Sequence, residues 1–220
     1  MMTAFTFCHL TAFSVLIPLS AICWKWKSIS QQYSFLVVLL VIGAISDLIS
    51  YLTIRFYGHN IVNGNLYLLI EFILFGLFFK QWPSDRYNRF HLWIITAGIL
   101  VWVVDNLIIH SLFTSNSISR LVCYILLVCI SIDQLISTIL HRATSVTKTA
   151  ILICMAYLFH YSYRAFIESF LLYTTHLDVS YFIRLWFIDN GLNILTNLMI
   201  TLAFLCHRHK PTYSILSSQH

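Results

Sequence analysis

Three side chains that could do chemistry lie in one long apolar stretch, Tyr157 to Tyr173. His160, Arg164 and Glu168 are spaced at i, i+4 and i+8, so a helix places them along one face. Arg164 is the only lysine or arginine that falls well inside an apolar stretch of the sequence. Because a guanidinium keeps its proton, it needs a carboxylate partner or water in such surroundings. We therefore expect a polar site around Arg164.

The composition indicates what surrounds this site. Of the 220 residues, 59% are hydrophobic and only 10% are charged, and the mean hydropathy is +0.81. A soluble domain cannot present such a surface to water, and apolar runs of roughly 20 residues are typical of membrane-spanning helices. The net charge of +5 comes from basic residues at the ends of apolar runs, which is typical of membrane anchoring. The expected partner is the lipid bilayer, and no nucleic-acid partner is expected.

The apolar runs predict an all-α integral membrane protein, a bundle of seven transmembrane helices. The domain would cover residues 1–206, and residues 207–220 would form a short cytoplasmic tail. The expected spans are Ala4–Trp24, Ser34–Ile54, Ile61–Phe79, His91–Phe113, Leu121–Leu140, Thr149–Tyr173 and Phe182–Cys206. Short polar connections predict that sequential helices are antiparallel neighbours. We expect the function to lie within the bilayer or with a partner.

Lysine and arginine residues are distributed unevenly between the two ends of these spans. One side of the membrane would hold only Arg55, Arg120 and Arg184. The other side would hold nine, namely Lys25, Lys27, Lys80, Arg86, Arg89, Arg142, Lys148, Arg208 and Lys210. Basic loops stay in the cytoplasm, so the N-terminus is expected outside and the C-terminus in the cytoplasm. The protein would lie in the plasma membrane, which is the inner membrane in a bacterium.

Carboxylates are unusually frequent inside the predicted spans. Of the eight acidic residues, only Asp85 and Asp178 fall in predicted loops. The other six are Asp47, Glu71, Asp105, Asp133, Glu168 and Asp189. Each carboxylate costs about 2.5–3.5 kcal/mol on insertion, so retention of six indicates a function. In the expected orientation, all but Asp133 lie toward the outer half of the membrane together with Arg164.

Amide, phenol and imidazole side chains accompany these acids at helical spacing. In a low-dielectric interior such groups hydrogen-bond carboxylates or a ligand. The predicted pocket, open or nearly open to the outside, consists of Asp47, Tyr51, Tyr67, Glu71, Asp105, Asn106, His160, Arg164, Glu168, Asp189, Asn190, Asn193 and Asn197. Two of its features also have structural interpretations. Arg164 and Glu168 would form a local ion pair that sets helix register, and the three asparagines would hold helices together.

The expected topology and the outward polar pocket favour a receptor-like sensor of a small ligand or ion. Arg164 can neutralise about one carboxylate, so the remaining acids must be protonated, hydrated or matched by a cation. The predicted topology is similar to that of seven-helix receptors, and in topology only. No lysine lies in the middle of a span, which argues against a retinal protein. Such a sensor would signal through a separate partner or a homo-oligomer.

Two other classes of protein remain open. A small proton-coupled transporter would use the buried carboxylates and His160 as a proton relay. An intramembrane hydrolase is less favoured. Zinc hydrolases of the ceramidase and adiponectin-receptor kind use a histidine cluster with an HxxxH pair. Here His9, His110 and His160 lie on different spans, and no span contains HxxxH. The six cysteines form no CxxC pair, and no metal, cofactor or catalytic residue is expected. Paired carboxylates would still permit metal-free hydrolysis.

The topology is tested with a fluorescent reporter that folds only in the cytoplasm. Fused after His220, it should fluoresce, because the excess of basic residues places that end in the cytoplasm. A dark fusion that is expressed at a normal level would contradict the orientation.

Overall fold

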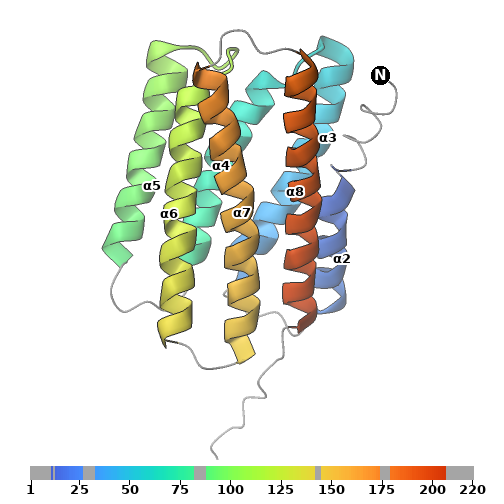
Figure 1. Cartoon of the computed structure of the whole chain (residues 1–220), viewed down its shortest axis with the longest axis vertical. Coiled ribbons are helices and arrows are strands. Elements are labelled where there is room, and N and C mark those ends of the chain that lie inside the picture. Colours follow the sequence, from blue (N-terminus) through green and yellow to red (C-terminus); the bar gives the residue numbers. More distant parts are fainter. Residues whose placement is uncertain are drawn as a thin grey trace, which may run out of the picture.

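The computed structural model is a bundle of helices without strands over the residues that it describes, which are 11, 13–26, 33–81, 88–141, 145–173 and 179–206 (Figure 1). The helices are η1 (Phe13–Val15), α2 (Leu16–Trp24), α3 (Ser34–Tyr57), α4 (Ile61–Lys80), α5 (Asn88–Val103), the π-helical segment η4 (Val104–Ile109), α6 (Ser117–His141), α7 (Ser145–Tyr173) and α8 (Val179–Cys206). The all-α prediction is therefore confirmed for this part of the chain.

Six helical stretches among the described residues are long and apolar enough to cross a membrane. The helix at the expected first span, Phe13–Trp24, is shorter than these six. The beginning of that expected span, residues 4–10, and the expected tail, 207–220, lie outside the described residues. The chain is thus a multi-helix protein of membrane-embedded type, while the count of seven spans and the orientation stay predictions.

The helices form a ring whose seam joins the first described helix to the last. Contacts run from α2 to α3, α3 to α4, α4 to α6, α6 to α7, α7 to α8 and back from α8 to α2. Helix α5 packs against α4 and α6, at the left edge of the bundle in Figure 1. It is therefore peripheral to the ring. The groups that α5 carries are consequently far less suited to line the interior than those of α3, α4, α7 and α8.

Hydrogen bonds close the seam between the N-terminal segment and α8. Thr11 Oγ1 donates to Asn190 Oδ1 at 2.7 Å, and Asn197 Nδ2 donates to Ser14 Oγ at 2.7 Å. At the other end of α8, Lys25 Nζ donates to the carbonyl oxygen of Leu205 at 2.6 Å. Polar bonds between helices are favoured in an apolar medium, where water cannot compete for them.

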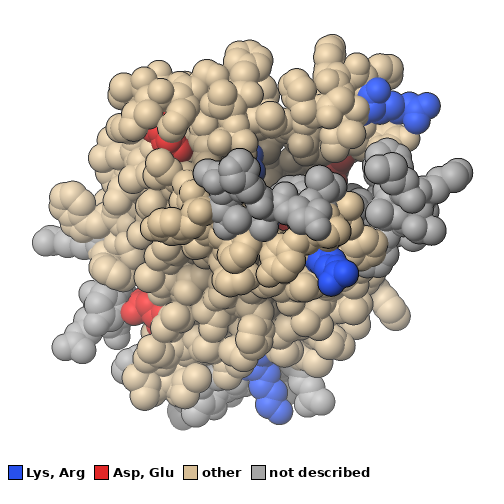
Figure 2. Space-filling view, turned by 45° about the horizontal axis from the view of Figure 1, so that its top comes forward, with Lys and Arg blue, Asp and Glu red and all other residues tan. Residues whose placement is uncertain are grey.

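The polarity of the helices is the reverse of that in a soluble bundle. On α6, Ile139 is 60% exposed, whereas its neighbour Thr138 is 1% exposed and Gln134 is also buried. Figure 2 shows a surface that is mostly tan, with only small, separated groups of charged atoms. A surface of aliphatic and aromatic side chains suits a bilayer, and it leaves the polar groups to face the interior.

Aromatic side chains of α4 pack the bundle at the end toward Lys80. Phe72, Phe75, Phe78 and Phe79 are fully buried. The ring centroid of Phe75 lies 4.6 Å from those of Phe79 and Tyr157, in edge-to-face arrangements. Such pairs contribute about 0.5–1.5 kcal/mol each beyond the area that they bury. This cluster fixes α4 against α7.

The start of α4 is helical although its sequence contains two asparagines and a glycine. Asn63 Nδ2 donates to the Ser46 carbonyl at 3.0 Å and to Ser50 Oγ at 2.8 Å on α3. Asn65 Nδ2 donates to the carbonyls of Leu112 and Thr114, each at 3.0 Å. Because both amides are engaged by neighbouring segments, they do not compete for the backbone of their own helix.

Two glycines let α4 and α5 approach closely. A Cβ atom at Gly98 would overlap the ring of Phe72, and one at Gly76 would lie 2.5 Å from Ile95 Cγ1. Small residues at helix contacts are typical of membrane bundles, because dispersion contacts between backbones replace the missing hydrophobic driving force.

Gly98→Ala should destabilise the bundle, because the added methyl group meets the buried Phe72 ring. We expect the free energy of unfolding to fall by about 1–3 kcal/mol, although alanine is the better helix former. Thermal unfolding in detergent measures this. Gly191→Ala is the control, since nothing lies within 4 Å of its added Cβ. Equal stability of the two variants would contradict the close packing of α4 on α5.

Candidate ligand-binding site

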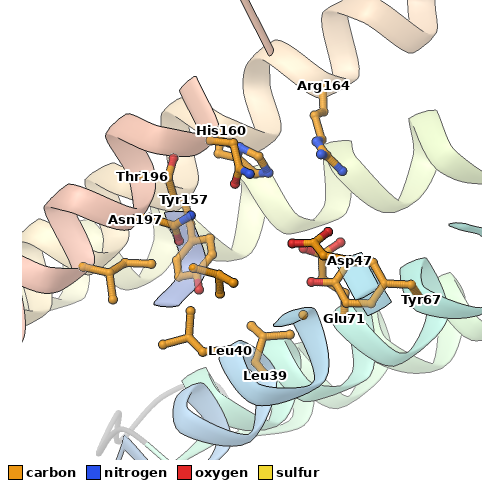
Figure 3. A pocket seen from close by; sticks show the side chains of 14 residues that line it. Leu39, Leu40, Asp47, Tyr67, Glu71, Tyr157, His160, Arg164, Thr196 and Asn197 are labelled. Atoms are coloured by element: carbon orange, nitrogen blue, oxygen red, sulfur yellow. The ribbon is translucent and has the colours of Figure 1, made fainter. Parts of the chain in front are cut away.

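A cavity of about 90 Å³ lies inside the ring, between α3, α4, α7 and α8 (Figure 3). It is lined by seven of the residues predicted to form a pocket, namely Asp47, Tyr67, Glu71, His160, Arg164, Asn193 and Asn197. The sequence therefore identified most of the polar wall. A cavity of this size holds on the order of six water molecules, so a ligand would be small.

The cavity lies near the middle of its helices. Glu71 is central in Ile61–Lys80, and His160 is central in Ser145–Tyr173. The lining extends past the acids toward the expected cytoplasmic side, to Leu39 on α3 and Ile200 on α8. Whether the cavity opens to the outside stays a prediction.

Arg164, whose side chain is half-buried, contacts a carboxylate on another helix. Its Nε atom lies 3.5 Å from Asp189 Oδ1 on α8. Its Nη1 atom donates to the Tyr124 hydroxyl at 3.3 Å, and the guanidinium carbon lies 5.9 Å from the centroid of that ring. The pair joins α7 to α8, and the tyrosine adds α6. The carboxylate beside Arg164 is therefore Asp189 on another helix, and not Glu168 on its own helix.

A second arginine, Arg120, forms an ion pair with Glu168 on α7. Its Nη1 atom lies 3.7 Å from Glu168 Oε1, and its Nη2 atom donates to Asn65 Oδ1 at 2.9 Å. The sequence indicated Arg120 only as a basic residue at the outer end of a span. Its long side chain instead reaches inward to α4 and α7. Glu168 therefore has a cation of its own and is absent from the lining of the cavity.

Asp47 and Glu71 are the two carboxylates that line the cavity. The hydroxyl of Tyr161 donates to Glu71 Oε1 at 3.2 Å. Among the described residues, the buried Glu71 Oε2 and His160 Nδ1 have no hydrogen-bond partner. In Figure 3 the two carboxylates lie together and face the space below Arg164 and His160. Buried polar atoms of this kind need water or a ligand, because leaving them bare is costly.

Amides of α8 serve two purposes. Asn190 and Asn197 hold the N-terminal segment through their bonds to Thr11 and Ser14, so part of the asparagine stripe is structural. Asn193, between them, lines the cavity. Tyr51, by contrast, is 38% exposed and is not part of the lining.

Asp105 and Asn106 lie outside the cavity and organise the connection from α5 to α6. Asp105 Oδ2 accepts a bond from the backbone N–H of Ser119 at 2.8 Å, and Oδ1 lies 2.9 Å from His110 Nδ1. Asn106 Nδ2 donates to Ser119 Oγ at 3.1 Å. A carboxylate at the first turn of a helix satisfies free N–H groups and complements the helix dipole.

This capping also explains two differences in helix bounds. The span predicted to reach Phe113 ends its helix at Ile109, through the π-helical turn that contains Asp105. The next helix begins at Ser117 rather than at Leu121.

Asp133, the remaining acid, lies 3.4 Å from His91 Nε2. Within the described part of the chain, no group of three or more His, Cys, Asp or Glu side chains is placed to hold a metal ion.

Arg164→Met should lower stability strongly, because Asp189 is then left buried without its cation. Breaking a buried pair in this way typically costs ~3–5 kcal/mol. Adding Asp189→Asn should recover part of the loss, whereas adding Glu168→Gln should not, since Glu168 is paired with Arg120. Thermal unfolding in detergent measures all three variants, with Arg184→Met, at an exposed arginine of α8, as the control. Rescue by Glu168→Gln alone would contradict the assignment.

Comparison with protein-family models, with curated proteins and with solved structures found no match for this chain.

Proposed function

We propose that this protein binds a small monovalent cation in the mid-bundle cavity and acts as a receptor-like sensor. The observation that carries the proposal is the balance of charge around the cavity. Asp47 and Glu71 face it, whereas Arg164, the one arginine or lysine among the described residues of its lining, is 3.5 Å from Asp189. One arginine cannot neutralise three carboxylates. A bound cation would supply the missing positive charge.

The other side chains of the cavity fit this ligand. The faces of Tyr67 and Tyr157 attract cations through their ring electrons. The amides of Asn193 and Asn197 and the hydroxyl of Thr196 offer oxygen atoms. An anion would meet two carboxylates and only one arginine, whose charge is already shared. The cavity therefore favours a cation over an anion.

A sensor has to convert occupancy of the cavity into a structural change that a partner molecule detects. Helices α3, α4, α7 and α8 all contribute to its wall, so a cation that draws Asp47 and Glu71 toward it would change how these helices pack. A separate membrane or cytoplasmic partner, or a second copy of the chain, would read that change. The ligand can shift the equilibrium between the two helix arrangements only by the difference between its binding free energies for them.

Proton-coupled transport is the second candidate, and the depth of the cavity favours it. Sites in transporters commonly lie near the middle of the membrane, where both sides can gain access in turn. His160 and Glu71 each present a buried atom with no hydrogen-bond partner among the described residues, and both are suited to carry a proton. In proteoliposomes with a pH-sensitive dye inside, a sodium gradient that moves protons would favour transport. Binding without proton movement would favour sensing.

Cation binding is tested by thermal unfolding of the purified protein in detergent. Sodium, potassium, ammonium and methylammonium chlorides are compared at equal ionic strength with N-methylglucamine chloride, whose cation is too large for the cavity. At 100 times its Kd, a ligand raises the free energy of unfolding by about 2.7 kcal/mol. Asp47→Asn and Glu71→Gln should each reduce the shift, and the double variant should abolish it.

Asp133→Asn is the matched control, because this carboxylate lies outside the cavity beside His91. It should leave the cation-dependent shift unchanged. The absence of a shift with every cation, or an equal shift in the Asp47→Asn, Glu71→Gln double variant, would rule out the proposed function.

A further inference from the structure

One end of the cavity is polar and the other is apolar. On α3, Leu39, Gly43 and Asp47 follow one another at intervals of one helical turn and all line the cavity. The acid lies at the end of this row nearer Tyr57, and the leucine lies at the end nearer Ser34. The row covers about 12 Å along the helix axis. The wall thus changes from charged to apolar within one small site.

The same change occurs on two more helices. On α7, Arg164 and His160 are followed toward Ser145 by Tyr157. On α8, which runs in the opposite direction to α7, the lining is polar at Asn193, Thr196 and Asn197 and becomes apolar at Ile200. In Figure 3, Leu39 and Leu40 lie apart from the carboxylates of Asp47 and Glu71. The charged groups thus lie at one end of the cavity, and aliphatic side chains of α3 and α8 lie at the other.

We propose that the ligand is a short-chain alkylammonium ion. Its ammonium group would lie against Asp47 and Glu71, and its alkyl chain would lie between Leu40 and Ile200. This inference rests on the proposed function, because it names the class of cation. A bare metal ion would leave the apolar end filled only with water. An alkyl chain instead buries its methylene groups there, and each is worth about fourfold in Kd, from about 0.8 kcal/mol per methylene.

The size of the cavity limits the length of the chain. A volume of about 90 Å³ corresponds to on the order of six water-sized positions. One position is taken by the ammonium group, which leaves room for about four or five carbon atoms. Gly43 keeps the middle of the passage open, since a Cβ atom there would lie 3.2 Å from the hydroxyl oxygen of Tyr67.

The test is a series of n-alkylammonium chlorides from methyl to hexyl, with isothermal titration and thermal unfolding of the purified protein as readouts. The Kd should fall about fourfold with each methylene up to butylammonium and should rise again for hexylammonium. The matching n-alkanols should not bind, because they lack the charge. In Asp47→Asn the whole series should weaken, which separates binding in the cavity from partition into the detergent.

Leu40→Ala should move the preference toward longer chains, so that hexylammonium binds more tightly than butylammonium. Leu52→Ala is the matched control on the same helix, since Leu52 is 42% exposed on the outer surface of α3. If Leu40→Ala does not fold, Ile200→Val tests the same end of the cavity and should improve hexylammonium relative to butylammonium.

The outcomes separate the two proposals. Equal affinity for ammonium, sodium and every alkylammonium ion would overturn the inference and leave the proposed function standing. Equal binding of alkanols would overturn the inference as well, because the carboxylates would then play no part. No binding of any cation would overturn both.

Discussion

The permanent charge of Arg164 is the constraint on which the interior of this protein depends. A guanidinium inside an apolar bundle cannot become neutral, so carboxylates have to come to it from other helices. Asp189 does so from α8, and Tyr124 contributes a hydroxyl from α6. With Asp47 and Glu71 nearby on α3 and α4, a single charged side chain of α7 brings groups from four other helices toward one depth in the bundle.

Different interactions hold the two halves of the bundle. Toward the ends that carry Arg120 and Glu168, basic and acidic groups alternate across α6, α7 and α8. Toward the other ends, aromatic rings pack between α4 and α7, with Phe75 in contact with both Tyr157 and Tyr161. Ion pairs in an apolar medium are directional, whereas ring packing depends on shape. The cavity lies where one kind of contact gives way to the other.

The helices and most of the polar wall could be predicted from the sequence, because apolar length and i, i+4 spacing are properties of a single segment. The position of each helix around the bundle could not be, since it depends on packing between segments. Asp105 has the chemistry and the depth expected of a site residue, but it lies on η4, which continues α5 outside the ring, and it caps α6. The sequence indicates Arg120 only as a residue at the end of a span, because it shows where the backbone lies and not where the long side chain reaches.

The seam between the N-terminal segment and α8 has a consequence for biosynthesis. The bonds from Thr11 to Asn190 and from Lys25 to Leu205 join residues about 180 positions apart. Helices that enter the bilayer one after another therefore form an open arc until α8 packs against α2. Until then, Asp47 and Arg164 are exposed along the inner edge of this arc. During translation the chain has to keep these charged groups solvated or shielded by the insertion machinery. Contacts of such long sequence separation are also the slowest to form, so closure of the ring is the natural last step of folding.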